Sequence, residues 1–299
     1  MKANKFLLKS LALVLMSTAI ISCGDDDESS LPPIGGYNNA DEIGAADLVA
    51  YWPLNGNGVE SKSNTSPSAT VGTTYTTAVK GQGVNLVNGY LAYPEISALS
   101  SSIPSMTISL WAKVTNNGGE DGHPTMMFSL TRPNEWGGNI NFMAETGWRP
   151  ATADTLVVKG LAIIKNEDGG ANFQDIINSA NPSPDDIAAG HSAQPNKNGG
   201  QWAHYVLTWD APTAMFRLYA NGAKISNPVW ESRNGGNALP LNFFTPTRPV
   251  IGTFGSVAFG TPDSWQRPMN GQIDEIRVWK KVLNQADINA LYELELAGR

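Results

Sequence analysis

The chain is poor in the residue types that most often mark cross-links and metal sites. Its only cysteine is Cys23, so no disulfide can form within the chain and the fold must be held by its hydrophobic core. Its three histidines lie far apart and include no His-x-x-x-His pair, which argues against a zinc site of that kind. One of them, His204, lies inside a strand pattern, where we predict a structural role.

Several catalytic motifs are also missing. The sequence has no Gly-x-Ser-x-Gly elbow, no glycine-rich phosphate loop and no cysteine placed as a nucleophile. Acidic residues outnumber basic ones, 27 to 20, and this balance argues against a nucleic-acid partner because polyanions are repelled. The sequence therefore predicts a protein that is not an enzyme and that binds no nucleic acid.

The first 22 residues have the features of a secretory signal. Three lysines, at positions 2, 5 and 9, accompany an apolar run over residues 6–21, which is shorter than the roughly 20 residues that a membrane-spanning helix needs. The run ends in Ile20-Ile21-Ser22-Cys23, which resembles the lipobox of bacterial lipoproteins. The resemblance implies that residues 1–22 are a lipoprotein signal peptide and that the Cys23 thiol receives the lipid.

An acidic cluster, Gly24-Asp25-Asp26-Asp27-Glu28, follows the cysteine. It resembles the surface-export signal of lipoproteins in some glycan-degrading Gram-negative bacteria; the alternative is a solvated spacer. Residues 23–45, acidic and then rich in proline and glycine, are predicted to form a flexible tether. Loss of the signal removes three lysines and no acid, so the formal charge moves from −7 to −10. We expect a lipid-anchored protein of the outer membrane, exposed on the cell surface.

Residues 46–299 are predicted to form one all-β domain. Short β-rich runs alternate with clusters of glycine, asparagine, proline and serine, the pattern of a sandwich or barrel. Asn221-Gly222 predicts a tight hairpin, and the capping pair Asn284 and Asp287 predicts a C-terminal helix whose apolar residues share one face. The clearest strand candidates are residues 48–54, 84–93, 106–114, 125–130, 156–164, 202–209, 215–220, 249–254 and 272–280.

Four segments, in order and at fitting separations, carry a resemblance to a known family. They are LVAYWPLNGN at 48–57, MTISLWAK at 106–113, the run from WAHYVLTWD to FRLYANG at 202–222, and NGQIDEIRVW at 270–279. Together they resemble the laminin-G-like, pentraxin-related branch of the concanavalin A-like domains. The resemblance implies an all-β jelly-roll sandwich of two antiparallel sheets with a short C-terminal helix, a fold that by itself fixes no function. Residues 115–200 match least and are expected to form rim loops.

The same fold hosts β-glucanases, which carry Glu-x-Asp-x-x-Glu on one strand so that two carboxyls flank the sugar bond. The nearest match, Ile273-Asp274-Glu275-Ile276, lacks the leading glutamate, and its two acids alternate across a strand. The motif is therefore absent. A hydrolase with an atypical active site stays open as an alternative, and its only clustered carboxylates in the long loops are Glu120, Asp121, Glu135 and Glu145.

Jelly rolls of this branch often hold a calcium ion at the rim of the sandwich. Calcium needs six to eight oxygen ligands, which a turn rich in carbonyl and carboxyl groups can supply. The resemblance implies a structural calcium held by Asn55 and Glu60, in the turn after the first strand, and by Asp274. Glu60 stands where many relatives have aspartate, and Lys62 adds a positive charge to the turn. The alternative is that Asp274 caps backbone amides or pairs with Arg277.

Sugar rings stack on aromatic faces while their hydroxyls bond to amides, carboxylates and arginine, so tryptophans in polar loops are candidate ligand-binding residues. Three qualify, namely Trp136, Trp148 with Glu145 beside it, and Trp265 with Arg267. The alternative is that these rings only pin long loops to the sandwich. Tryptophans in strand patterns are expected in the core; they are Trp52, Trp111, Trp202, Trp209 and Trp279, of which Trp111 shares its strand face with polar residues.

These features predict a surface-anchored, carbohydrate-binding lipoprotein that captures polysaccharide for a degradation and uptake system. Its expected partners are polysaccharide or oligosaccharide, the outer membrane through the lipid anchor, and glycan-uptake proteins of the envelope. Two alternatives remain open at this point. One is an adhesion or scaffold module that binds protein, and the other is the atypical glycoside hydrolase.

Overall fold

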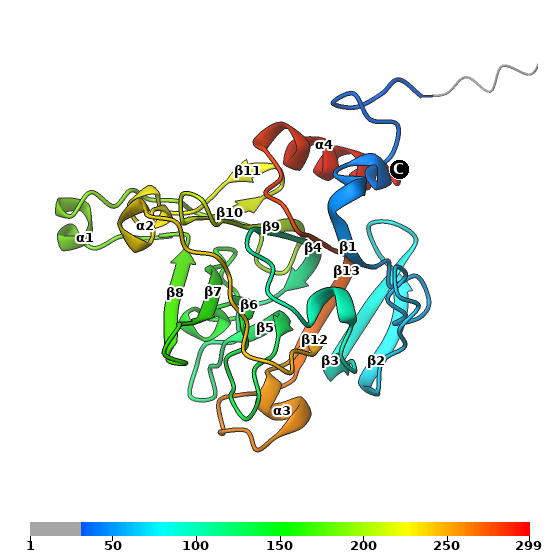
Figure 1. Ribbon diagram of the computed structural model, residues 1–299, viewed down its shortest axis with the longest axis horizontal. Helices are drawn as coiled ribbons and strands as arrows, with labels where there is room; N and C mark the ends of the chain where they lie inside the picture. The colour runs from blue at the N-terminus through cyan, green and yellow to red at the C-terminus, as the bar shows by residue number, and fades with distance from the viewer. Residues whose placement is uncertain (1–30) are drawn as a thin grey trace, which may run out of the picture. The chain divides into compact units, whose positions relative to one another are not determined.

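The nine runs predicted as strands each contain a strand in the computed structural model, which describes residues 31–299 (Figure 1). The predicted signal peptide, Cys23 and the acidic cluster lie outside the described residues. The strands are β1 Leu48–Trp52, β2 Ala69–Thr77, β3 Gln82–Ala92, β4 Met106–Val114, β5 Thr125–Leu130, β6 Ile140–Ala144, β7 Val158–Lys165, β8 Ala171–Ile177, β9 Trp202–Asp210, β10 Met215–Ala220, β11 Ala223–Lys224, β12 Pro249–Ile251 and β13 Met269–Trp279.

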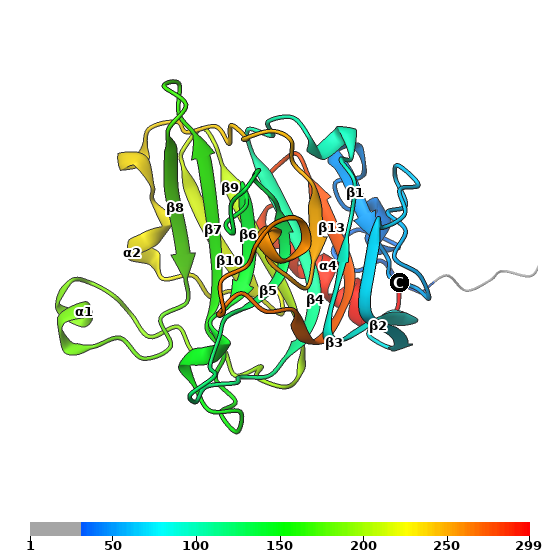
Figure 2. The same ribbon diagram turned by 90° about the horizontal axis from the view of Figure 1, so that it is seen from below.

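The strands pair antiparallel in one continuous sheet that curls so that its two halves face each other (Figures 1 and 2). The order is β11-β10-β9-β4-β13-β3-β12-β5-β6-β7-β8, with β1 on β13 and β2 on β3. The start of β3 pairs with β13 and its end pairs with β12, which in turn pairs with β5. The predicted all-β jelly roll is confirmed, and β3 and β12 join its two halves.

The core fills the space between the two halves of the sheet. Trp52 contacts Phe128 edge to face, with 5.5 Å between ring centroids, and both side chains are fully buried. A Cβ on Gly160 of β7 would lie 2.4 Å from Leu207 Cδ1 of β9, so only glycine lets the two layers approach this closely. Phe216 on β10 packs in the same cluster. Close packing of this kind lets a disulfide-free domain hold its shape.

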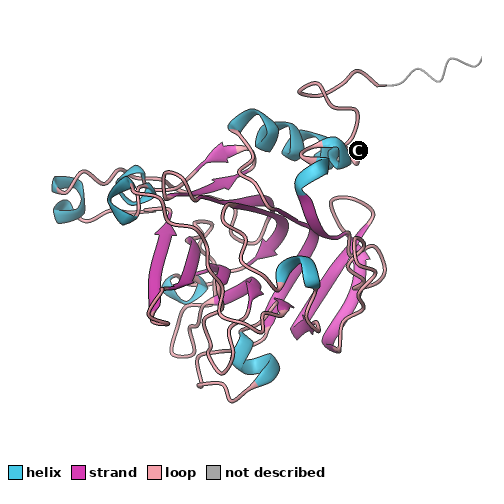
Figure 3. Cartoon of the chain, viewed as in Figure 1, coloured by secondary structure: helices cyan, strands magenta, loops and turns pink. Residues whose placement is uncertain are grey.

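Residues 115–200 supply more than rim loops, because β5 to β8 lie within them. Helices are few (Figure 3). They are the short α1 Pro184–Ala188, α2 Pro228–Glu231 and α3 Gly255–Phe259, the longer α4 Gln285–Leu296, and several single 3-10 turns. Within residues 31–299 no helix is both long and apolar enough to cross a membrane.

The C-terminal helix α4 begins and packs as its sequence predicts. Asn284 Oδ1 accepts a hydrogen bond from the Asp287 amide at 2.9 Å, which caps the helix. The helix covers the outer face of the β4, β9 and β13 strands, where Tyr292 stacks on Trp111 with 5.6 Å between centroids. Trp111 therefore lies on the outer face and is nevertheless 2% exposed.

The segment before β1 is part of the domain, which the predicted tether over residues 23–45 did not anticipate. The compact unit begins at Pro33, and Ala40 and Ile43 are buried beside α4. Trp279 Nε1 donates to the Ile43 carbonyl at 3.0 Å, and Tyr37 Oη donates to Asp287 at 2.8 Å. The predicted boundary at residue 46 is therefore too late, because these apolar and polar contacts join residues more than 200 positions apart.

Removing residues 33–45 should destabilise the domain. We expect a chain that begins at residue 46 to unfold with a free energy about 3 kcal/mol lower than one that begins at residue 33. The shorter chain exposes the pocket of the buried Ile43 and removes Asp41, which contacts Arg277 at 2.7 Å. Urea unfolding followed by tryptophan fluorescence measures the difference, and equal midpoints for the two chains would show that the segment is only a tether.

Candidate functional site

Of the predicted calcium ligands, Glu60 is fully buried and bonds to backbone amides. Its Oε1 accepts from the amides of Tyr51 at 2.7 Å and Lys62 at 2.9 Å, and its Oε2 accepts from the Ser63 amide at 2.7 Å. A carboxylate in this position holds the turn after β1 against β1 itself, because it accepts from one amide of β1 and two amides of the turn.

Asp274 and Asn55 act in the same way on a different segment, the turn between β2 and β3. Asp274 Oδ2 accepts from the amides of Val79 and Lys80 at 3.1 and 3.0 Å, while Asn55 Oδ1 accepts from the Gln82 amide at 3.0 Å. Burial raises the pKa of Asp274 to about 7. No three acidic, histidine or cysteine side chains in residues 31–299 converge as metal ligands. The carboxylates of Glu60 and Asp274 thus bond to the amides of two different turns, and calcium stays a prediction from the resemblance.

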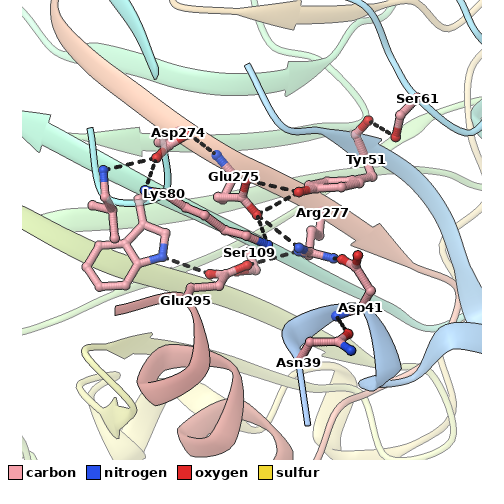
Figure 4. A network of polar contacts seen from close by, with 12 residues as sticks. Asn39, Asp41, Tyr51, Ser61, Lys80, Ser109, Asp274, Glu275, Arg277 and Glu295 are labelled. Carbon is pink, nitrogen blue, oxygen red and sulfur yellow. Dashed lines mark hydrogen bonds and ion pairs between the residues drawn. The ribbon is translucent and has the colours of Figure 1, made fainter. Parts of the chain in front are cut away.

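A buried charge network surrounds Arg277 on the outer face of β13 (Figure 4). Its Nη2 contacts Glu275 at 2.9 Å, its Nε contacts Glu295 of α4 at 2.9 Å, and its Nη1 contacts Asp41 at 2.7 Å. The guanidinium lies 3.9 Å above the Tyr51 ring. Burial raises the pKa of Glu295, against the opposing effect of Arg277. The network joins the N-terminal segment, the sheet and α4.

One part of this region has the composition of a catalytic triad but not its geometry. Ser109 Oγ lies 2.6 Å from His204 Nε2, and Glu295 Oε2 lies 3.7 Å from the same nitrogen. In a triad the acid faces the other ring nitrogen, and here Nδ1 has no partner among the described residues. All three side chains are fully buried, and burial lowers the pKa of His204 to about 3. The histidine is structural.

Most of the carboxylates considered for a hydrolase are buried or paired with a basic side chain. Asp274 and Glu275 are both buried, so a polysaccharide cannot reach them. In the loops, Asp121 pairs with Arg267 at 3.3 Å, and Glu135 pairs with Arg132 at 3.6 Å. The first ion pair joins two loops, and the second lies within the β5–β6 loop, so both acids are paired with an arginine.

Two of the three loop tryptophans pin loops to the sheet. Trp136 and Trp265 contact each other edge to face at 5.2 Å, and both pack against the buried Phe254. Each ring is partly buried in a small apolar cluster with Met126 and Met143. The structure therefore brings Trp136 and Trp265 together, but mainly as contacts between the β5–β6 loop and the segment around α3.

Trp148 is different, because its indole is 62% exposed. It ends a 3-10 turn, Thr146–Trp148, whose fully buried Thr146 donates through its hydroxyl to the His123 carbonyl at 2.7 Å. The Trp148 amide donates to the Glu145 carbonyl at 3.2 Å. These bonds fix the backbone, so the exposed ring is held in place without being covered.

Two adjoining cavities, of about 210 and 370 Å³, lie beside this ring. Trp148, Ile177 and Trp230 line both, so the two cavities form one surface, which we call the tryptophan cleft. Trp230 belongs to α2 and packs edge to face on His191 with 4.6 Å between centroids. The cleft is thus lined by an exposed indole, that of Trp148, and by a supported, partly buried indole, that of Trp230.

Charged groups cross the tryptophan cleft. Lys159 Nζ lies 3.7 Å from Glu145 and 3.4 Å from Asp175, and Arg233 lies 3.6 Å from Asp175. Burial raises the pKa of Glu145. Nε of Arg149 is buried with no hydrogen-bond partner in residues 31–299. The walls therefore offer donors and acceptors for hydroxyl groups beside the two indole rings.

Only part of this cleft follows from the sequence. Trp148 was predicted, and so was Glu145, which pairs with the lining residue Lys159. Trp230 was missed although its neighbours in sequence are also polar, the signal that identified the three loop tryptophans. Among the strand tryptophans, Trp202 is partly exposed rather than in the core, because its β9 register places it on the outer face opposite Lys113.

Comparisons with known proteins agree with the geometry of the sheet. The structure resembles the binding domain of Paraclostridial Mosquitocidal Protein 1 (TM-score 0.53, 15% identity, covering 83% of this chain and 52% of that one). It also resembles the binding domain of botulinum neurotoxin serotype C1 (0.52, 16%, 84% and 53%) and the serotype D ligand-binding domain in complex with N-acetylneuraminic acid (0.50, 12%, 85% and 52%). The chain spans about half the length of these proteins, and at such identities the likeness shows the fold alone.

No curated protein matches the sequence. Residues 85–289, more than half of the chain, match the family described as the concanavalin A-like lectin/glucanases superfamily. The matched range runs from β3 to α4 and includes the strands and loops that form the tryptophan cleft. The chain therefore belongs to the concanavalin A-like lectin/glucanase superfamily.

Proposed function

We propose that this protein binds carbohydrate in the tryptophan cleft and has no catalytic role. The observation that carries the proposal is the exposed indole of Trp148 at the junction of two cavities that Trp230 also lines. A sugar ring can stack on the indole while its hydroxyls bond to Arg149, Asp175 and their neighbours. The neighbours in structure that are themselves binding domains support a binding role at the level of the fold.

The same proposal includes the location that the N-terminal sequence predicts. A signal peptide, a lipidated Cys23 and an acidic segment after it would hold the domain on the outer surface of the outer membrane. A cleft of modest volume on a tethered domain suits capture of a long polymer, because many weak contacts along one chain add up at a crowded surface. Capture would then supply polysaccharide to degradation and uptake proteins in the envelope.

Affinity electrophoresis tests the function directly. Residues 24–299 are run through native gels that contain neutral and acidic polysaccharides, and we expect retardation by at least one polymer. Incubation of the same polymer with the protein should release no reducing ends, because the loop acids Asp121, Glu135 and Glu145 are each paired with a basic side chain. Absence of retardation across the panel would contradict carbohydrate binding, and reducing-end release would contradict the non-catalytic role.

One observation favours protein binding as a second candidate. Ile187 on α1 and Val229 on α2, on the two short helices beside the tryptophan cleft, are 60% and 44% exposed. Exposed apolar side chains near one another often mark an interface with protein. Competition by a free sugar distinguishes the two candidates. The sugar should release the domain from a bound polysaccharide, but it should not release the domain from a protein that is bound through apolar contacts alone.

A further inference from the structure

A second cleft, which we call the polar cleft, lies beside the loops that carry Trp148. It has a volume of about 490 Å³, and of its ten lining residues nine have polar side chains and none is acidic. The Asn117 amide donates to the Thr146 carbonyl at 2.9 Å, and the Gly118 amide donates to the Arg149 carbonyl at 2.7 Å. The loop that lines the polar cleft is therefore hydrogen-bonded to the loop that lines the tryptophan cleft.

The residues at the base of the polar cleft are positioned by the pairing of three strands, β3, β13 and β4. Gln272 of β13 lies between Lys113 of β4 and Asn85 of β3 in the sheet register, so all three side chains project from one face. Gly271 comes next to Gln272 and contributes only backbone to the lining, since a Cβ there would lie 2.7 Å from the Lys113 carbonyl. Asn270 lines the same cleft. The result is a row of amides with one ammonium group.

Lys113 has no ion-pair partner in the part of the chain that the structure describes. It is exposed, and the loop after β4 contains two acids: Asp121 contacts Arg267 at 3.3 Å, and Glu120 does not line the polar cleft. The chain as a whole carries a formal charge of −7 and repels polyanions at a distance, but salt screens this repulsion beyond about 10 Å, so the charge that an anion in the cleft meets is the local one. A cation in a cleft without carboxylates makes a local positive potential on an acidic protein, which favours an anionic group at this place.

Asn116 supplies a second, independent sign of a ligand. It is 2% exposed, and its Nδ2 donates to the carbonyls of Ala153 and Thr155 at 2.9 Å each. Its Oδ1 is buried and has no hydrogen-bond donor among residues 31–299. A buried acceptor without a donor is costly, so a group that brings a hydroxyl into the cleft would be stabilised.

We propose that the polar cleft binds an acidic saccharide unit, whose carboxylate contacts Lys113 and whose hydroxyl donates to Asn116. The two groups require opposite chemistry, an acceptor for the ammonium and a donor for the amide oxygen. Inorganic sulfate offers only acceptors, and a neutral sugar offers no charge for Lys113. The proposal rests on the carbohydrate-binding function and names the class of polysaccharide, a polymer that contains uronic or similar acidic sugars.

Affinity measurements with charged and neutral polymers test the proposal. Residues 24–299 are titrated with polygalacturonate, alginate and hyaluronan, with the carboxyl-reduced form of whichever binds, and with neutral polysaccharides. We expect Lys113→Met to weaken binding of the acidic polymer about tenfold, because a charge-assisted hydrogen bond is lost. Lys113→Arg should keep the affinity for the acidic polymer within about threefold of that of wild type. Wild type should lose about the same factor when the polymer is carboxyl-reduced, because the charge partner of Lys113 is then missing.

A matched control removes the same charge elsewhere. Lys165 is exposed at the end of β7 and does not line the polar cleft, so Lys165→Met should leave every affinity unchanged. Binding of neutral polymers alone, or equal affinity of wild type and Lys113→Met for the acidic polymer, would overturn this proposal and leave the carbohydrate-binding function standing. Failure to bind any polysaccharide would overturn both.

Discussion

Replacing Trp148 with alanine should lower the affinity for the polysaccharide about thirtyfold, equivalent to about 2 kcal/mol. The indole is 62% exposed and stands where two cavities meet, so a bound sugar would cover a large apolar face that the free protein leaves in water. The backbone of the turn is held by Thr146 and Glu145, so the loss of the ring should not move it. Retardation in affinity gels gives the change in dissociation constant.

The control for this result is another exposed aromatic residue that lines neither cavity. Phe173 on β8 is 57% exposed, so Phe173→Ala removes a similar apolar area without touching the tryptophan cleft. Both variants should unfold in urea within about 0.5 kcal/mol of wild type, because the replaced side chains are at the surface. Equal effects of the two substitutions on binding would place the sugar somewhere else on the domain.

Arg277→Met should lower the free energy of unfolding by about 3–5 kcal/mol. The guanidinium is fully buried and contacts Glu275, Glu295 and Asp41 at 2.9, 2.9 and 2.7 Å. Methionine fills a similar volume but leaves buried Glu295 without its arginine and Glu275 with only Lys80, at 3.8 Å, and an unpaired buried charge is more costly than a missing apolar contact. Arg277→Lys should be intermediate, because an ammonium cannot form the planar, forked contacts that reach three acids at once.

Arg267→Met provides the matched comparison for the second prediction. Arg267 also pairs with an acid, Asp121, at 3.3 Å, but its side chain is 43% exposed. Exposed ion pairs contribute about 0–1 kcal/mol, so this variant should be nearly as stable as wild type in the same urea titration. If Arg277→Met lost less than about 1 kcal/mol, the network around it would have to be solvated rather than buried.

Strand prediction from the sequence succeeded where apolar and polar residues alternate or where a run is bounded by turn residues. The nine predicted runs all contain strands, and the Asn221-Gly222 hairpin forms with both residues at positive φ. The strands that were missed lack this signal. β2 is rich in threonine and pairs along only one edge, with β3, and β6 has five buried residues in a row. Neither shows the two-residue period of a half-buried strand.

The candidate site was predicted less completely than the fold, and the tryptophans show why. Trp136, Trp148 and Trp265 have similar polar neighbours in sequence, yet only Trp148 is well exposed. Trp136 is partly buried because Trp265, more than 100 residues later, packs against it. Exposure of a loop side chain depends on which distant segment covers it, and the local sequence does not contain that information.

The sequence by itself determined the class of the fold, the hairpin, the capped C-terminal helix and the absence of the glucanase motif. These depend on local patterns of hydrophobicity and turn chemistry, which act within a few residues. Only the tertiary structure decided that residues 33–45 belong to the domain, that Asp274 holds the amides of Val79 and Lys80, and that Trp148 faces a cleft with Trp230. Each of these rests on contacts between residues far apart in the chain, which form only when the sheet has curled and its outer face has been covered.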